Sequence, residues 1–127
     1  MNTSWENLFK VRIANPDDSF QKHEVCKLLI VMKILKLHKR KFHIRLYTEH
    51  PVNSHKCDIY FEDWKSKAVY IYEIQKAYSN KWLTKQTNFY NNFEVLGFNS
   101  VNFVPINLKD CPDNIQELNK ELDKYIV

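Results

Sequence analysis

Two acidic residues and an amide near the middle of the chain have the types and spacing of a hydrolytic site. Residues 57–76 contain two runs that alternate apolar and polar residues, joined by Asp-Trp-Lys-Ser-Lys, and this pattern predicts two adjacent strands. Asp58 opens the first strand and Glu73 ends the second, so both carboxylates are expected at one place in the sheet. Glu73 and Gln75 follow two β-branched residues on the face that should be buried, where a carboxylate is costly unless it is paired or holds a cation.

A pair of carboxylates at one place in a sheet suits the hydrolysis of a phosphodiester bond. A hard divalent cation with oxygen ligands polarises the phosphate and lowers the pKa of a bound water. Asp58 and Glu73 would supply two ligands, with the backbone carbonyl of Ile74 as a third. Glu24, which enters from a preceding helix, could add a direct or water-mediated ligand, and Gln75 could orient the attacking water. The expected cofactor is therefore Mg²⁺ or Mn²⁺.

The elements that must position these residues predict an α/β fold with a central mixed sheet of about four strands, flanked by helices. At 127 residues the chain is expected to form a single domain, residues 1–127. Pro105 predicts that the last strand lies at a sheet edge or ends there. The expected order is a helix over 19–38, strands over 41–48, 57–62 and 68–76, a helix over 81–96, a strand over 100–108 and a helix over 114–126.

The first predicted helix carries an apolar stripe with helical spacing. Glu24 falls at the edge of this stripe, where it could either reach solvent or point toward the sheet. Residues 49–56 are predicted to form a polar loop. Gly97, the only glycine, is expected to end the second helix as its C′ residue. The stripe is formed by Val25, Leu28, Leu29, Met32 and Leu35.

The order of elements and their acidic residues resembles the PD-(D/E)XK nuclease superfamily over roughly residues 19–108. The layout is especially similar to archaeal Holliday-junction resolvases and to small viral or plasmid nucleases. The resemblance implies a restriction-endonuclease-like core in which Glu24, Asp58 and Glu73 are the catalytic acids. Gln86, in the second predicted helix, lies where resolvase-like members carry a polar residue.

The chain departs from the superfamily pattern at two positions. Cys57 precedes the motif aspartate where the pattern has proline. Gln75, in Glu-Ile-Gln-Lys, replaces the motif lysine, as it does in some branches. Lys76 is predicted to point to the opposite face, whereas Lys81 or Lys85 could deliver an ammonium group from the second helix. A binding-only member of the superfamily is therefore an alternative.

Positive charge is concentrated between Lys22 and Arg45, where eight Lys or Arg residues accompany one acid, Glu24. This distribution favours a polyanionic partner, and the alternative is a solvated helix face. Contacts to DNA phosphates would be independent of sequence and sensitive to salt. The longest apolar run, residues 28–32, is too short to span a bilayer, so no membrane partner is expected. The predicted phosphate contacts are Lys33, Lys36, Lys39, Arg40 and Lys41, with Lys81 and Gln86 from the second helix.

The cysteines and histidines offer weaker signals. Three cysteines without a C-x-x-C pair or a secretory signal predict reduced thiols in an intracellular, cytoplasmic protein. His50, His55 and Cys57 could bind a transition metal, and the alternative is that the histidines are solvated loop residues. Five aromatic residues could stack bases or belong to the core. These are Tyr70, Tyr72, Tyr78, Trp82 and Tyr90.

The sequence as a whole predicts a metal-dependent deoxyribonuclease, in particular an endonuclease of resolvase-like or structure-selective type. The single glycine argues against glycine-rich phosphate loops. A homodimer would suit a junction-cutting enzyme, which needs two sites. The richness in Lys, Asn, Ile and Tyr fits an AT-rich genome such as that of a virus or mobile element. Two alternatives are a nuclease-fold DNA-binding module without catalysis and a protein-interaction domain that uses the aromatic surface and the acidic last helix.

Overall fold

The computed structural model describes residues 18–38, 41–53 and 55–126. It confirms the predicted order of a helix, three strands, a helix, a strand and a helix. Three short 3₁₀ helices, η2 (Lys41–His43), η3 (Leu108–Asp110) and η4 (Leu122–Tyr125), follow α1, β4 and α3. The main elements are α1 (Asp18–Leu37), β1 (Ile44–Val52), β2 (His55–Asp63), β3 (Ala68–Gln75), α2 (Asn80–Asn91), β4 (Ser100–Asn107) and α3 (Ile115–Glu121).

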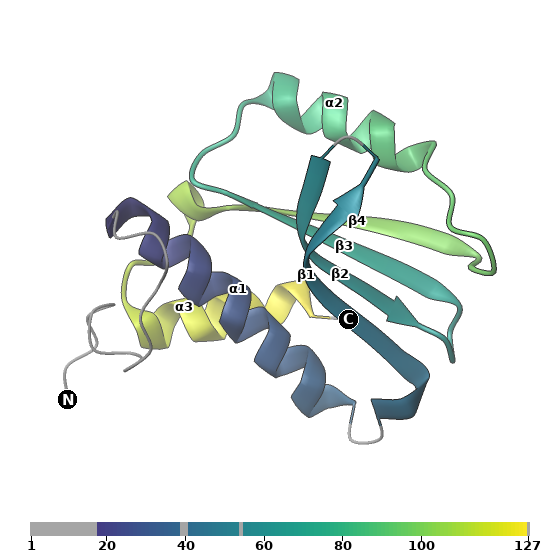
Figure 1. Ribbon diagram of the computed structural model, residues 1–127. Helices are drawn as coiled ribbons and strands as arrows, with labels where there is room; N and C mark the ends of the chain where they lie inside the picture. The colour runs from purple at the N-terminus through teal and green to yellow at the C-terminus, as the bar shows by residue number, and fades with distance from the viewer. Residues whose placement is uncertain (1–17, 39–40, 54, 127) are drawn as a thin grey trace.

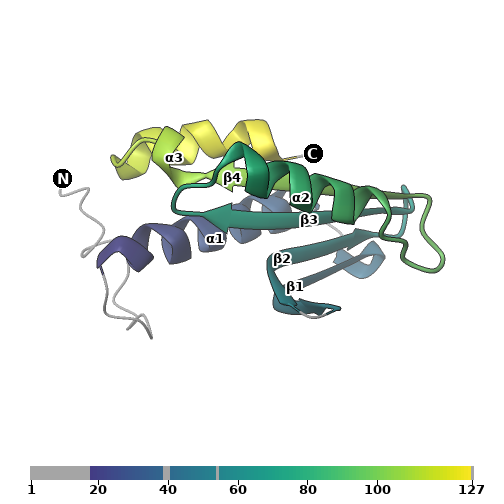
Figure 2. The ribbon, with the colours of Figure 1, turned by 90° about the horizontal axis from the view of Figure 1, so that it is seen from above.

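The four strands form one mixed sheet in the order β1-β2-β3-β4. β1, β2 and β3 are antiparallel neighbours, whereas β4 runs parallel to β3 and is reached through α2, as parallel strands require a crossover connection. Helices α1 and α3 lie on one side of the sheet and α2 on the other (Figures 1 and 2). Pro105 lies on β4 at the edge of the sheet, as its missing N–H predicted.

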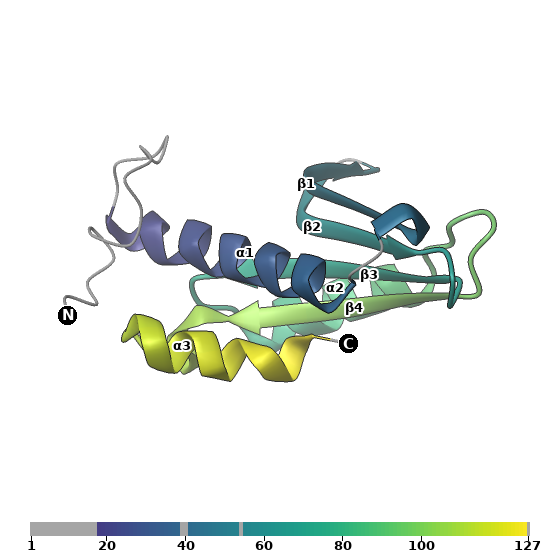
Figure 3. The ribbon, with the colours of Figure 1, turned by 90° about the horizontal axis from the view of Figure 1, so that it is seen from below.

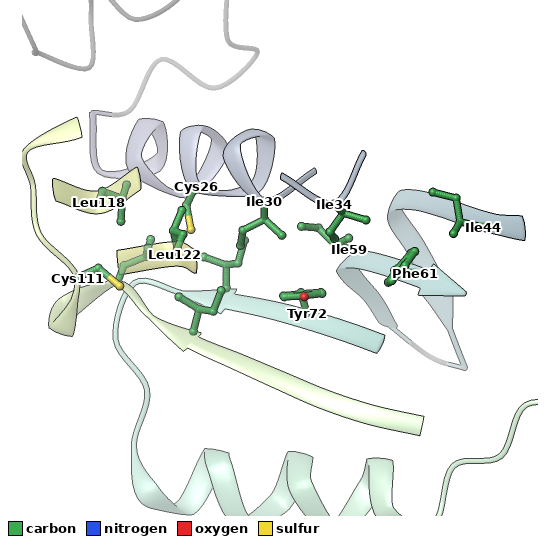
Figure 4. Close-up of a cluster of buried hydrophobic side chains, with 13 residues drawn as sticks. Cys26, Ile30, Ile34, Ile44, Ile59, Phe61, Tyr72, Cys111, Leu118 and Leu122 are labelled. Atoms are coloured by element: carbon green, nitrogen blue, oxygen red, sulfur yellow. The ribbon is translucent and has the colours of Figure 1, made fainter. Parts of the chain in front are cut away.

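The larger hydrophobic core fills the space between the sheet and the pair α1 and α3 (Figures 3 and 4). Ile30 and Ile34 of α1 pack there against Phe61 of β2 and Tyr72 of β3, and all four are at most 1% exposed. A second cluster of buried residues lies on the α2 side of the sheet and consists of Val52, Cys57, Tyr60, Val69, Ile71 and Tyr90. No helix in the described part of the chain is long and apolar enough to cross a membrane.

The predicted apolar stripe of α1 is wrong in part. Leu28 and Met32 are 38% and 53% exposed, and the fully buried row is instead Cys26, Ile30 and Ile34. The helix contains two overlapping apolar rows. Because α3 packs beside α1, the buried row is the one that faces the sheet and also contacts the cluster containing Leu118 of α3 and Leu122 of η4 (Figure 4).

The predicted loop over residues 49–56 and the predicted end of α2 are also wrong. β1 continues to Val52 and β2 starts at His55, with Asn53 in the left-handed region at φ 55°. Pro51 is tolerated because β1 is an edge strand. Helix α2 ends at Asn91 with Asn92 as its C-cap, and Gly97, at φ 91°, lies in the loop that follows.

Burial predicts that the three cysteines of the folded protein are unreactive. Cys26 and Cys57 are 0% exposed, and burial raises the pKa of each thiol to about 12. Burial also raises the pKa of Cys111. Because the thiolate is the reactive form, we expect Ellman's reagent at about pH 8 to label the native chain very slowly, and to titrate three thiols in guanidinium. Rapid labelling of one thiol without denaturant would contradict this packing.

Candidate active site

The strands β2 and β3 separate at the two predicted acids. Their pairing runs from Asp63 opposite Ala68 to Ile59 opposite Tyr72 and then stops. In place of the next strand partner, the backbone N–H of Ile74 donates to Oδ2 of Asp58 at 2.6 Å. The Asp58 carboxylate therefore occupies the gap between the diverging strands, next to the step of β3 that carries Glu73.

A local distortion of the β1–β2 hairpin directs the Asp58 side chain. The pairing of the two strands omits one step, Glu49 opposite Asp58, and Glu49 has φ 51°, a conformation that non-glycine residues rarely adopt. Such irregularities bend a strand and redirect its side chains. Asp58 consequently faces α1, whereas Tyr60 packs in the cluster on the α2 side. The regular alternation of the sequence predicts one shared face for Asp58 and Tyr60, and this prediction is wrong.

A chain of charged side chains links Asp58 to α1. His23 Nε2 lies 3.1 Å from Asp58 Oδ1, and His23 Nδ1 lies 3.2 Å from Glu24 Oε1. Lys27 Nζ lies 2.9 Å from both Glu24 Oε2 and Glu49 Oε1. Glu24 is thus turned toward the site rather than away into solvent. His23, however, lies between Glu24 and Asp58.

His23 is a site residue that the sequence analysis missed. It lies one turn before Cys26 on the row that continues to Ile30 and Ile34, so a correct choice of the buried row would have found it. Burial lowers its pKa, but hydrogen bonds and charge from Asp58 and Glu24 outweigh this effect, and the net pKa of His23 is raised.

Glu73 is the one buried charged residue of the described chain, at 6% exposure. Its Oε2 atom has no hydrogen-bond partner among the described residues. Its Oε1 atom lies 3.9 Å from His55 Nε2, and the Tyr90 hydroxyl lies 3.0 Å from the same nitrogen. Burial, together with the negative charge of Asp58, raises the pKa of Glu73 despite the opposing effects of Tyr90 and His55.

His55 and Tyr90 are further residues whose role the sequence did not indicate. The sequence favoured a solvated loop position for His55, but it opens β2 and contacts both Tyr90 and the ring of Phe89. Tyr90 is 1% exposed, so it belongs to the core rather than to a base-stacking surface. His50 and His55 do not meet at a metal site, because the distortion at Glu49 turns His50 onto the ring of Tyr60.

Of the remaining predicted catalytic residues, those of β3 adjoin the acids and those of α2 form no ion pair with them in the described part of the chain. Gln75 ends β3 two residues after Glu73 and is half-buried, and Ile74 is buried beside Asp58. Lys81 and Lys85 are exposed on α2, and neither forms an ion pair with Asp58 or Glu73 within the described ranges. The ammonium group expected from α2 is therefore not part of this arrangement.

The predicted phosphate contacts of α1 are only partly free. Lys33 Nζ lies 2.6 Å from Asp123 Oδ1 of η4, and Lys22 and Lys27 are held in similar ion pairs, so these charges link elements of the fold. Lys36 is exposed. Lys39 and Arg40 lie outside the described residues, and Lys41 begins η2. On α2, Gln86 is half-buried.

The acids fit a divalent cation in their chemistry, but the set of side-chain ligands is small. Among the described residues, no three His, Cys, Asp or Glu side chains are placed to hold a metal ion. A cation would rely on Asp58, Glu73 and oxygens that are not side chains, such as the Ile74 carbonyl and water, in keeping with the preference of Mg²⁺ for retaining waters. Oε2 of Glu73, which has no hydrogen-bond partner in the described part of the chain, is an oxygen that such an ion would satisfy.

The raised pKa of Glu73 predicts that this carboxylate destabilises the metal-free fold. The folded state holds the Glu73 proton more tightly than the unfolded state, so stability falls as pH rises through and above the ordinary glutamate range. We expect Glu73→Gln to raise the free energy of unfolding at about pH 8 by roughly 1 kcal/mol, and by less near pH 4.5. Urea unfolding of both chains in chelator measures this difference. A Gln variant that is less stable at pH 8 would show that the carboxylate has a structural role.

No protein-family model, curated protein or solved structure matches the chain. The resemblance to the nuclease superfamily therefore stays a prediction from the order of elements and the acidic residues.

Proposed function

We propose that this protein is a metal-dependent nuclease that hydrolyses DNA phosphodiester bonds at Asp58 and Glu73, on a restriction-endonuclease-like core. The state of Glu73 carries the proposal. Within the described residues, the buried Glu73 carboxylate has one oxygen without a hydrogen-bond partner, and the negative charge of Asp58 adds to the burial that raises its pKa. Two carboxylates that repel each other in a partly buried place are unfavourable without a positive charge between them.

A divalent cation is the positive charge that fits this pair best. Mg²⁺ or Mn²⁺, when bound, would supply Lewis-acid polarisation of the phosphate and a water of lowered pKa. Asp58 and Glu73 would hold the ion with the carbonyl of Ile74. For this, Oδ1 of Asp58 must exchange its contact with His23 for one with the ion, while the Ile74 N–H keeps Oδ2 in place.

The surrounding side chains support the two acids. Tyr90 and His55 hold one side of the Glu73 carboxylate and thereby restrict its orientation. Glu24 binds the far nitrogen of His23 and acts as a positioning residue. Gln75 follows Glu73 on the same face of β3. There its amide can accept a hydrogen bond from the attacking water or donate one to it.

A binding module without catalysis is the second candidate function. Gln75 carries no charge, and among the described residues no lysine forms an ion pair with Asp58 or Glu73. Within residues 18–38, 41–53 and 55–126, the site therefore has no counterpart of the cation that the motif lysine supplies in the proteins it resembles. This candidate predicts salt-dependent DNA binding that persists in chelator, with no product in any metal.

Cleavage assays with a matched acid control test the proposal. We expect labelled linear duplex, single-stranded or four-way-junction DNA to be cut with Mg²⁺ or Mn²⁺ and not with EDTA. Removing a residue that only supports a metal ligand lowers activity roughly 10- to 100-fold. Asp58→Asn, which alters a proposed ligand itself, should reduce the rate by more than that. Glu62→Gln, which alters another acid of β2, should retain the rate.

Two outcomes would count against the proposed function. Cleavage that survives in Asp58→Asn would place the chemistry elsewhere. Binding of DNA without product in either metal would support the binding module, and the substitution Gln75→Lys would then show whether restoring the motif residue restores cleavage.

A further inference from the structure

We propose that the connection between β3 and α2, together with the first turns of α2, is a binding surface for single-stranded DNA. The surface consists of Lys76, Tyr78, Lys81, Trp82 and Lys85, and is called here the α2 platform. Only the cleavage of the bound strand rests on the proposed function. The binding itself does not require cleavage and is tested without it.

The charge of this region favours a polyanion. Residues 76–93 contain three lysines and no Asp or Glu. Lys76, Lys81 and Lys85 are all exposed, and the described part of the chain provides no ion-pair partner for any of them. On α1 the opposite holds, because Lys22, Lys27 and Lys33 each pair with an acid of another element. Lys81 and Lys85 of α2, and Lys76 just before it, are therefore available to a polyanion in a way that the paired lysines of α1 are not.

The aromatic residues of the platform favour unpaired bases. The rings of Tyr78 and Trp82 are stacked, with centroids 5.0 Å apart and an interplanar angle of 24°. Trp82 also contacts Phe103 of β4, which supports the pair from the sheet side. Both rings remain half-exposed. Stacking on aromatic rings beside a basic groove is how proteins bind single strands without reading their sequence.

Asp110 limits which edge of the platform can meet phosphates. Burial and the negative charge of Asp110, which belongs to η3, raise the pKa of Tyr78, so the η3 side of the platform is unfavourable for a phosphate. We therefore expect the phosphates to follow the lysines of α2, and the bases to lie against the rings.

The platform is close enough to the acids to guide a strand to them. Tyr78 is three residues past Gln75, which ends β3, and five residues past Glu73, so the Cα atoms of Tyr78 and Glu73 are at most about 18 Å apart. Figure 1 shows the connection rising from the end of β3 to the start of α2. A strand held here would favour substrates with an unpaired segment next to the scissile bond, such as flaps and junctions.

Binding of a labelled oligothymidylate of about 15 nucleotides in EDTA tests the proposal. We expect fluorescence anisotropy to show tighter binding of this strand than of a duplex of the same length. Tyr78→Ala should weaken binding at least fivefold, whereas Tyr47→Ala, which removes an exposed aromatic from β1, should not. Replacing Lys81 and Lys85 by Gln should lower the slope of log affinity against log salt by about 1.4, or roughly 0.7 for each lost phosphate contact. The control pair Lys65→Gln and Lys120→Gln should leave that slope unchanged.

A second measurement reports on the platform without altering it. Trp82 is one of three tryptophans, so the variant Trp5→Phe/Trp64→Phe makes it the only fluorophore of that kind. Quenching of Trp82 by the oligothymidylate is expected. Absence of quenching, or wild-type affinity in both Tyr78→Ala and the lysine variant, would overturn the platform. A chain that binds through Tyr78 but cuts no DNA in any metal would contradict the proposed function alone.

Discussion

The burial of the Glu73 carboxylate between the sheet and α2 is the constraint on which the site depends. A buried carboxylate loses its hydration, and the nearby Tyr90 and His55 compensate for only part of that loss, since the pKa of Glu73 stays raised. The neighbouring Asp58 adds repulsion. A chain under selection for stability alone would have placed an amide or an aliphatic residue here, so the retained charge points to a function that needs it.

The second acid reaches the site through a distortion of regular structure. β2 pairs with β3 only from Ile59 onward, so Asp58 lies in the part that has separated, and the left-handed Glu49 interrupts the β1–β2 pairing opposite Asp58. Lys27 ties Glu49 to Glu24 of α1, so the irregular strand is fixed by a helix on one side while α2 supports Glu73 on the other. The two layers of helices thus hold one carboxylate each, and the sheet brings the two carboxylates together. Any cation between them would also link the two halves of the fold.

The sequence predicted the helices and strands well because each has a local pattern of apolar and polar residues. It predicted a candidate site residue correctly only where that local pattern alone determines the position of the side chain. The alternation of β3 correctly places Glu73 on a buried face. The polarity of residues 49–56 concealed the end of the β1–β2 hairpin, and with it the position of His55. The position of Asp58 depends on one residue with positive φ, which no side-chain pattern reveals. His23 was missed because α1 carries two apolar rows, and only the packing of α3 decides which row is buried.

Binding of Mn²⁺ to the intact chain tests the central claim most directly, because it requires neither a substrate nor a rate. Titration calorimetry, with electron paramagnetic resonance of the free ion as a second readout, would compare the wild type with Asp58→Asn, Glu73→Gln and the control Glu62→Gln. We expect one Mn²⁺ per chain in the wild type and in the control, and loss of that site in both of the other variants. A wild-type chain that binds no Mn²⁺, or one whose binding is unchanged by both substitutions, would contradict that claim.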